Sequence, residues 1–140
     1  MTDSRREELL RLLSSPHAHQ CLVLNNEDLS RLDLRHVDLR GAVLRNADLR
    51  GCNLSHALLQ DAQLQGADLR GALLDHADLR GANLRRADLR GAYLHHADLR
   101  DAVLAEVRAA GAVVSAPRTS ANHGLERWHG ACIRHDVEAG

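Results

Sequence analysis

Leucine recurs at every fifth position through the middle of the chain. The register runs without a break from Leu24 to Leu104 and holds 17 leucines. The position two residues before each leucine is small in most repeats, and the residue between the two is often polar. The small residues are Ala42, Ala47, Cys52, Ala57, Ala62, Ala67, Ala72, Ala77, Ala82, Ala87, Ala92, Ala97 and Ala102. We therefore expect two positions in every five to face one common interior.

A five-residue period fits no straight element of secondary structure. On an α-helix each leucine would be rotated by about 140° from the one before, so the set would be spread around the whole cylinder. In a flat strand, an odd period would send successive leucines to opposite faces. The pattern therefore predicts an all-β solenoid, in which the chain bends once per repeat and stacked coils satisfy each other's backbone hydrogen bonds.

The outward positions indicate how many repeats complete a coil. Several polar residue types recur at intervals of twenty, which favours four repeats per coil, whereas fifteen-residue coils would mix histidine with glycine in one column. The recurring sets are Asp28, Asp48, Asp68 and Asp88, then His36, His56, His76 and His96, and also Arg50, Arg70 and Arg90.

Segments such as residues 47–51 have the form Ala-Asp/Asn-Leu-x-Gly, and this tandem pattern over residues 20–107 resembles the pentapeptide-repeat protein family. The resemblance implies a right-handed quadrilateral β-helix in which the central leucine and the small residue point inward. About four coils would then stack to a height of about 20 Å at the usual strand spacing. The expected core leucines are Leu44, Leu49, Leu54, Leu59, Leu64, Leu69, Leu74, Leu79, Leu84, Leu89, Leu94 and Leu99.

The first coil departs from this pattern. Bulky or charged residues hold its small-residue positions, so we expect it to be wider and irregular, with Glu27 outside the interior. These residues are Leu22, Glu27, Leu32 and Val37.

Residues 1–19 precede the repeats and are predicted to form a capping helix and a linker. Leu9, Leu12 and Leu13 form an apolar stripe within a helical pattern over residues 4–14. A solenoid exposes apolar core and unpaired strand edges at its ends. We therefore expect this helix to lie across the first coil.

Residues 108–140 lose the repeat and are expected to be partly irregular. Four residues near the end would share one face of a helix, although Gly130 disfavours a helix there. They are Leu125, Trp128, Cys132 and Ile133. We expect this segment either to cap the last coil, with a second short helix as one form of the cap, or to form a dimer contact, so that the chain is a monomer or a homodimer joined at this end. Disorder is the alternative.

The composition limits the interior and the environment. The chain of 140 residues is 44% hydrophobic yet has no Phe and only one each of Trp, Tyr and Met, so a thin core of leucine, alanine and valine is expected. Three cysteines are too few for a disulfide framework, which indicates a reducing compartment. No apolar run reaches the length of a membrane span. We expect a cytoplasmic protein that makes no membrane contact.

The charges nearly balance, with 18 basic residues, all of them arginine, against 19 acidic residues. The aspartate and arginine columns lie side by side, so they should neutralise one another as a solvated ladder of weak ion pairs. Both observations argue against nucleic acid as the partner.

The column of four histidines is the most unusual surface feature. Imidazoles stacked in this way are candidate ligands for Zn²⁺ or Ni²⁺. Parallel side chains one strand spacing apart do not converge on a tetrahedral centre, however, and no carboxylate or thiolate is fixed beside them. We therefore predict no metal site and no cofactor, and we retain a metal- or pH-responsive histidine face as a minor alternative.

Apolar residues at outward positions indicate a candidate partner surface. Leu73 and Tyr93 occupy equivalent places in adjacent coils, and Leu58 lies close to the histidine corner. The candidate surface consists of Leu58, Leu73, Tyr93, His56, His76 and His96. Simple cross-strand packing is the alternative interpretation. A second, interrupted apolar column consists of Val23, Val43 and Val103.

The sequence contains no nucleophile motif, no phosphate-binding glycine loop and no carboxylate pair with an evident cavity, so we predict no enzyme activity and no catalytic residues. The favoured function is a scaffold whose flat outer faces bind an unidentified protein. The resemblance implies an alternative, because some pentapeptide-repeat proteins imitate duplex DNA and protect DNA gyrase and topoisomerase IV from quinolones. Those members are long, acidic, dimeric rods, whereas this chain is short and nearly neutral.

Overall fold

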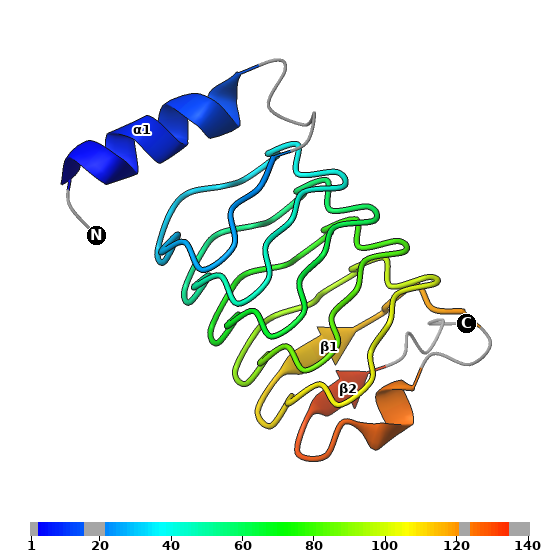
Figure 1. Cartoon of the computed structure of the whole chain (residues 1–140). Coiled ribbons are helices and arrows are strands. Elements are labelled where there is room, and N and C mark those ends of the chain that lie inside the picture. The colour runs from blue at the N-terminus through cyan, green and yellow to red at the C-terminus, as the bar shows by residue number, and fades with distance from the viewer. Residues whose placement is uncertain (1–2, 16–21, 121–123, 135–140) are drawn as a thin grey trace.

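The computed structural model describes residues 3–15, 22–120 and 124–134. Its body is a stack of four-sided coils, with a helix at one end and a short irregular segment at the other (Figure 1). The helix α1 spans Asp3–Ser14, β1 spans Val113–Ser115, the 3₁₀ helix η1 spans Leu125–Arg127 and β2 spans Cys132–Arg134. The predicted right-handed quadrilateral β-helix is confirmed.

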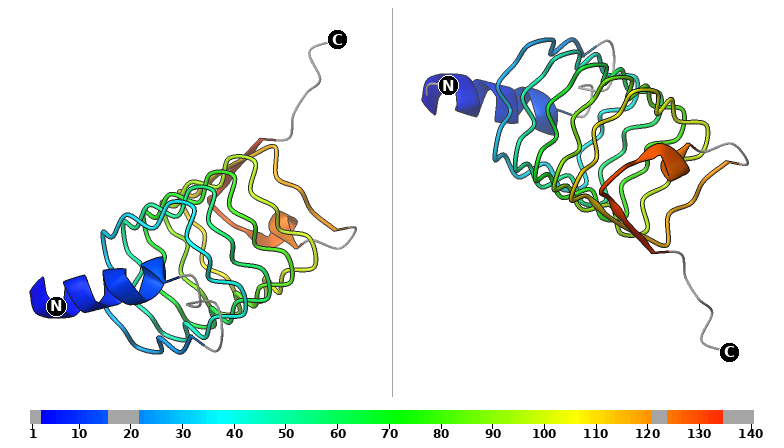
Figure 2. Two further views of the ribbon diagram at one scale, coloured as in Figure 1. Left: turned by 90° about the horizontal axis from the view of Figure 1, so that it is seen from above. Right: turned by 90° about the horizontal axis from the view of Figure 1, so that it is seen from below.

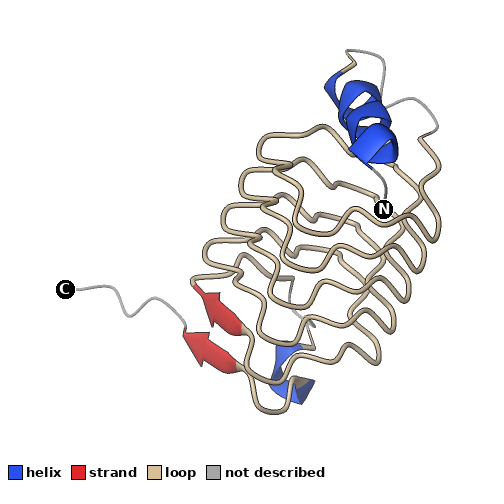
Figure 3. Ribbon diagram, turned by 90° about the vertical axis from the view of Figure 1, so that its left-hand side faces the viewer, coloured by secondary structure: helices blue, strands red, loops and turns tan. Residues whose placement is uncertain are grey.

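Adjacent coils are joined by parallel bridges between residues twenty apart. Pairs such as Leu73 with Tyr93 recur at every fifth residue from Val23 onward, which confirms four repeats per coil. Backbone N–H groups next to each bridge donate to the following coil, as Leu49 does to the carbonyl of Asp68 at 2.8 Å. Each side of a coil contains only one bridged residue, and the chain then turns at the next corner. These single bridges are too short to count as strands, so most of the body appears as loop in Figure 3.

Each corner of a regular coil is a tight β-turn. After Leu49 the N–H of Cys52 donates to the Leu49 carbonyl at 3.2 Å, and Gly51 between them has a φ of 64°. A positive φ at the third residue, together with this hydrogen bond, defines a type II turn. Glycine, histidine, asparagine and aspartate predominate at the equivalent positions because these residues tolerate the left-handed conformation best.

Leucine fills the axis of the β-helix. The twelve leucines expected in the core are each at most 1% exposed, and no polar or charged residue is buried among the described residues. The small-residue positions from Ala42 to Ala97 are equally closed. Cys52 occupies one of them, where its thiol donates to the Leu29 carbonyl at 2.7 Å and burial raises its pKa to about 11. This cysteine is therefore an unreactive part of the core.

The helix α1 packs against the N-terminal end of the β-helix (Figure 2). Leu9 and Leu13 are buried, but Leu12 is 43% exposed and Leu10 is partly buried in its place. Leu10 and Leu12 lie about equally far on either side of the Leu9–Leu13 line. The predicted stripe was therefore wrong at Leu12, because the way the helix rests on the coil decides which flank is covered.

The first coil follows the same register as the others, with Val23 bridged to Val43 and Asp28 bridged to Asp48. We expected this coil to be irregular, and for its backbone pairing that prediction was wrong. The ladder of backbone hydrogen bonds does not depend on which residue fills the small position. Glu27 lies outside the core cluster and pairs with the guanidinium of Arg5 on α1. The carboxylate in this repeat thus helps to attach the capping helix.

The ladder of bridges continues beyond residue 107, where the repeat in the sequence was expected to end. Arg108 and Arg118 are still bridged to residues twenty positions earlier. Ala109, Ala112 and Val114 are buried at inward positions of this stretch. The coil therefore persists because other apolar residues replace the missing leucines.

Residues 124–134 cover the last coil. Leu125 and Trp128 belong to the buried core, and β2 pairs in parallel with β1, matching Cys132 with Val113 (Figure 3). The single helical face expected here was wrong, because η1 has only three residues and Gly130 turns the chain with a φ of 78°. As a result Cys132 is exposed and Ile133 is only partly buried.

Candidate functional site

His36, His56, His76 and His96 form a ladder along one corner. The ring centroids of neighbours are 4.9 to 5.0 Å apart, and their planes are inclined by 1° to 17°. All four side chains are exposed, and each histidine holds the left-handed turn position with a φ of 55° to 60°. The lone pairs of imidazole nitrogens lie in the ring plane, so rings in nearly parallel planes cannot direct them at one shared centre. Within the described ranges, no group of three metal-ligating side chains is arranged to hold an ion.

The remaining residues of the candidate surface lie on the two sides that meet at this histidine corner. Leu73 and Tyr93 are bridged to each other on one side, and Tyr93 is 42% exposed while Leu73 is half-buried. Val113 continues their column in the next coil. Leu58 is half-buried on the other side, two residues after His56. The structure thus places these apolar side chains beside the histidine ladder.

Aspartates pair with the arginine two residues later, and the hydrogen bonds of each pair have the same geometry. Asp48 accepts the backbone N–H of Arg50 at 3.2 Å, while Nε and one Nη of the same arginine donate to its two oxygens at 2.8 and 2.6 Å. The same pairing joins Asp33 to Arg35, Asp38 to Arg40, Asp68 to Arg70, Asp78 to Arg80, Asp88 to Arg90 and Asp98 to Arg100. Across coils, the Nε of Arg50 lies 3.9 Å from the carboxylate of Asp68.

These contacts favour the ionised form of Asp33 and of Asp48. The hydrogen bond from the Arg35 side chain is the main reason that the pKa of Asp33 falls to about 2, and the bond from Arg50 lowers the pKa of Asp48 in the same way. Each of the seven carboxylates in these pairs is matched by the guanidinium two residues later, so the pairs offer little unbalanced charge. This is the neutralised ladder expected from the sequence.

Residues 28–66 and 67–105 match a family model described as pentapeptide repeats, with eight copies. Together these two ranges cover more than half of the chain. The chain belongs to the pentapeptide repeat family.

Solved structures of pentapeptide repeat proteins are similar to this one. The crystal structure of alr5209 from Nostoc PCC 7120 is 35% identical, covers 78% of this chain and 86% of its own, and has a TM-score of 0.57. Rfr23 from Cyanothece 51142 is 25% identical over 81% of this chain and 85% of its own, with a TM-score of 0.30. QnrB1, a plasmid-mediated fluoroquinolone resistance protein, is 20% identical over 82% of this chain and 77% of its own, with a TM-score of 0.37.

A comparison with curated proteins found no match. Among the described residues of this pentapeptide repeat protein, no helix has the length and apolar character needed to cross a bilayer.

Polar residues border Tyr93 in this pentapeptide repeat protein, and they were not among the residues predicted from the sequence. The ring of His95 lies 6.3 Å from the ring of Tyr93, and its Nδ1 is hydrogen-bonded to the hydroxyl of Ser115. The backbone N–H of His95 donates to Asp75 at 3.0 Å. Asp75, His95 and Ser115 are spaced by twenty residues, so the coil period would have placed them in one column. They give the apolar patch a polar rim.

Proposed function

We propose that this pentapeptide repeat protein is a non-enzymatic scaffold that binds a protein partner at the histidine corner. The binding surface would consist of Leu58, Leu73, Tyr93, His56, His76 and His96. The observation that carries the proposal is the exposure of Tyr93, which is 42% accessible beside the bridged Leu73 and the stacked imidazoles. Aromatic side chains in such positions are enriched at the centres of protein interfaces.

The chemistry of the outer faces supports an apolar contact. Elsewhere on the surface, carboxylates are held by arginines, as in the pair of Asp68 with Arg70. A partner covering such a pair would have to remove both charges from water, and the attraction between them often fails to offset that loss. Around Tyr93 the polar groups stand at the rim. We therefore expect a partner whose contacting surface is apolar at its centre.

The rigidity of the β-helix supports the same proposal. Inner coils are hydrogen-bonded to the coil before and the coil after. The N–H of Leu73 donates to the carbonyl of Cys52 in the coil before, and the N–H of Leu74 donates to the carbonyl of Tyr93 in the coil after. A surface that is already ordered loses little conformational entropy when it binds. The straight columns also favour a flat partner surface over a deeply curved one.

A photo-crosslinking residue introduced at position 93 tests the proposal, with the same residue at position 83 as the control. Asn83 holds the equivalent outward position on another side, in the column of Val103. We expect one protein to be captured from position 93 and not from position 83, and Leu73→Ser to abolish that capture. Val103→Ser is the matched variant, because Val103 is also apolar and 43% exposed, and it should leave capture unchanged.

Two results would contradict the proposal. Equal capture from positions 93 and 83 would mean that the crosslinks are nonspecific. Unfolding of Leu73→Ser and Tyr93→Ser would show that the pair serves packing, since outward residues used only for binding should leave the melting temperature almost unchanged.

The DNA-mimic alternative requires a surface with an excess of negative charge. The aspartate columns are paired with arginines in each of the central coils, which is unfavourable for that role. A DNA gyrase supercoiling assay with ciprofloxacin separates the two functions. We expect no protection at stoichiometric protein, and protection would replace the scaffold proposal.

A further inference from the structure

Two arginines at the N-terminal end differ from the paired arginines of the columns. Within residues 3–15, 22–120 and 124–134, neither Arg6 nor Arg31 lies within 4.0 Å of a carboxylate oxygen, whereas Arg50 and Arg70 each bind an aspartate two residues earlier. Arg31 stands at a corner position, so the residue two before it is the core residue Leu29. Its guanidinium therefore lacks the built-in partner that the repeat supplies elsewhere.

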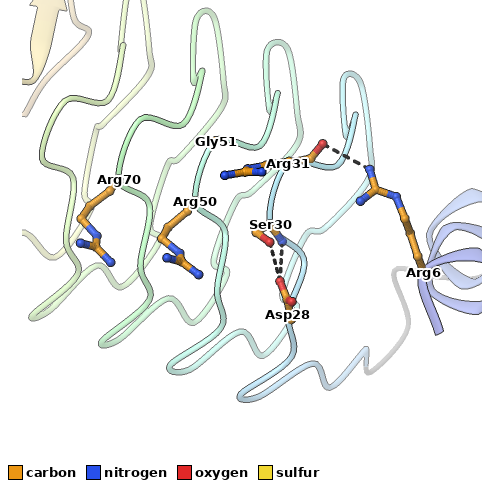
Figure 4. Close-up of a pocket in the computed structure, with 7 residues that line it drawn as sticks. All are labelled: Arg6, Asp28, Ser30, Arg31, Arg50, Gly51 and Arg70. Carbon is orange, nitrogen blue, oxygen red and sulfur yellow. Dashed lines mark hydrogen bonds between the residues drawn. The ribbon is translucent and has the colours of Figure 1, made fainter. Parts of the chain in front are cut away.

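The side chain of Arg31 lies along the column of corner residues, toward the next coil. In the next coil the equivalent position is Gly51, and the Cγ of Arg31 lies 3.5 Å from the place that a Cβ of residue 51 would take. Because glycine has no side chain, Arg31 can lie over this turn. Figure 4 shows its guanidinium pointing toward Gly51, in the direction of the coils that carry Arg50 and Arg70.

The capping helix brings the second arginine to the same place. Arg6 on α1 donates from Nη2 to the backbone carbonyl of Arg31 at 3.4 Å (Figure 4). Ser30 stands where the next three coils have arginine, and its N–H and hydroxyl bind Asp28 at 3.0 and 2.6 Å. The short serine leaves an open depression of about 470 Å³, lined by Arg6, Asp28, Ser30, Arg31, Arg50, Gly51 and Arg70.

The charges around the depression leave one positive charge in excess. Four guanidinium groups stand against Asp28, which lines the depression, and against Asp48 and Asp68, which bind Arg50 and Arg70. Asp88 lies 3.9 Å from Arg70 but is matched by its own partner, Arg90. In these two pairs the arginine uses Nε and one Nη, so further N–H donors stay available to a ligand. The depression therefore combines several planar donors with a weakly positive potential.

We infer that this depression binds a phosphate group in its dianionic form. Guanidinium groups recognise phosphate through paired hydrogen bonds, and a dianion with three acceptor oxygens can engage arginines that approach from α1 and from successive coils. A single carboxylate has fewer acceptors and would compete poorly with the aspartates already present. The phosphate could be free inorganic phosphate or a phosphoserine of a protein. This site lies at a different corner from the histidine ladder and is independent of the proposed scaffold function.

The test is a titration of the full chain with inorganic phosphate at neutral pH, followed by NMR of the arginine Nε–H groups. Arg31→Gly removes the guanidinium while restoring the residue that the next four coils have at this corner, where Arg31 has a φ of 62°. Arg86→Gly is the matched control, because Arg86 holds another corner with a φ of 61° and glycine precedes it in its column. Both variants lose one arginine from the same turn position.

We expect phosphate to shift the resonances of the wild type and of Arg86→Gly alike, and Arg31→Gly to bind about tenfold more weakly or worse. Binding should weaken as sodium chloride is added. Equal binding by Arg31→Gly and the wild type, or no binding by the wild type at millimolar phosphate, would overturn the inference. Arg6→Gln is a second test that leaves the coil intact, and Arg11→Gln on the same helix is its control.

A phosphoserine peptide and its unphosphorylated form distinguish the two sources of phosphate. Binding of the phosphopeptide with at least the affinity of inorganic phosphate, and its loss in Arg31→Gly, would support a phosphoprotein ligand. Binding of inorganic phosphate alone would support a free anion. Binding of both peptides to the same extent would contradict recognition of the phosphate group.

Discussion

The axis of the β-helix and its corners are built on the same five-residue period, yet they accept very different side chains. Leu49, Leu69 and Leu89 follow one another along one inward column, and all are at most 1% exposed. The corner column of Asn26 contains five members of four types, with backbone φ always near 60°. Its members are Asn26, Asn46, Gly66, Arg86 and Glu106.

The difference follows from what each position must satisfy. An inward position must fill a fixed volume, since interiors are packed at the density of organic crystals. A corner position must adopt the left-handed conformation. For a residue with a Cβ this costs about 1 to 2 kcal/mol, but the outer atoms of the side chain are not confined by neighbours. The axis therefore holds the fold together, while the corners are where this chain acquires individual chemistry such as the histidine ladder and Arg31.

The largest expected effect comes from the axis. Leu69→Ala should lower the free energy of unfolding by about 2 to 5 kcal/mol, because it leaves a cavity that the stacked coils cannot close. Leu58→Ala is the matched control at an outward, half-buried leucine, and it should cost clearly less. Urea titration measures both. Equal losses would mean that the axis is no more demanding than the surface.

A smaller effect is expected at two glycine corners that share the same backbone conformation. Gly66 and Gly71 have φ values of 68° and 67°, so alanine at either should cost about 1 kcal/mol or more. A Cβ at Gly66 would also collide with Oδ1 of Asn46, whereas nothing lies within 4 Å of one at Gly71. Thermal unfolding should therefore rank Gly66→Ala below Gly71→Ala in stability. Adding Asn46→Gly should remove the difference, and a gap that survives would refute the steric explanation.

The smallest effect is expected at an exposed carboxylate on the outer surface. Hydrogen bonds from Arg35 lower the pKa of Asp33 from 3.8 to about 2 in the folded chain. The associated stability is present above pH 4 and is lost as the pH falls toward 2, because the unfolded chain takes up the proton first. Asp33→Asn should make the acid slope of the unfolding free energy shallower. Asn53 and Asn83 already accept the backbone N–H two residues later, so the turn should survive. An unchanged slope would contradict the assignment.

Particular residues show where sequence reasoning succeeded and where it stopped. The stacking of Leu73 on Tyr93 and of His56 on His76 follows directly from the twenty-residue coil, because equivalent positions must become neighbours. The exposure of Leu12 did not follow, since it depends on how α1 rests on the first coil. The proximity of Arg6 to Arg31 was equally hidden, because it joins two segments that no shared period relates.

The amino-acid sequence by itself determined the bent repeat, the inward leucines, the four-sided coil and the columns on its faces. A strictly periodic chain has one arrangement that buries every leucine and pairs the backbone, so local pattern and global fold coincide. Only the tertiary structure decided which flank of α1 is covered, how far the coil extends past residue 107 and how the last segment closes the end. These contacts lie where the period breaks, and there the packing of particular side chains against an open coil selects the conformation.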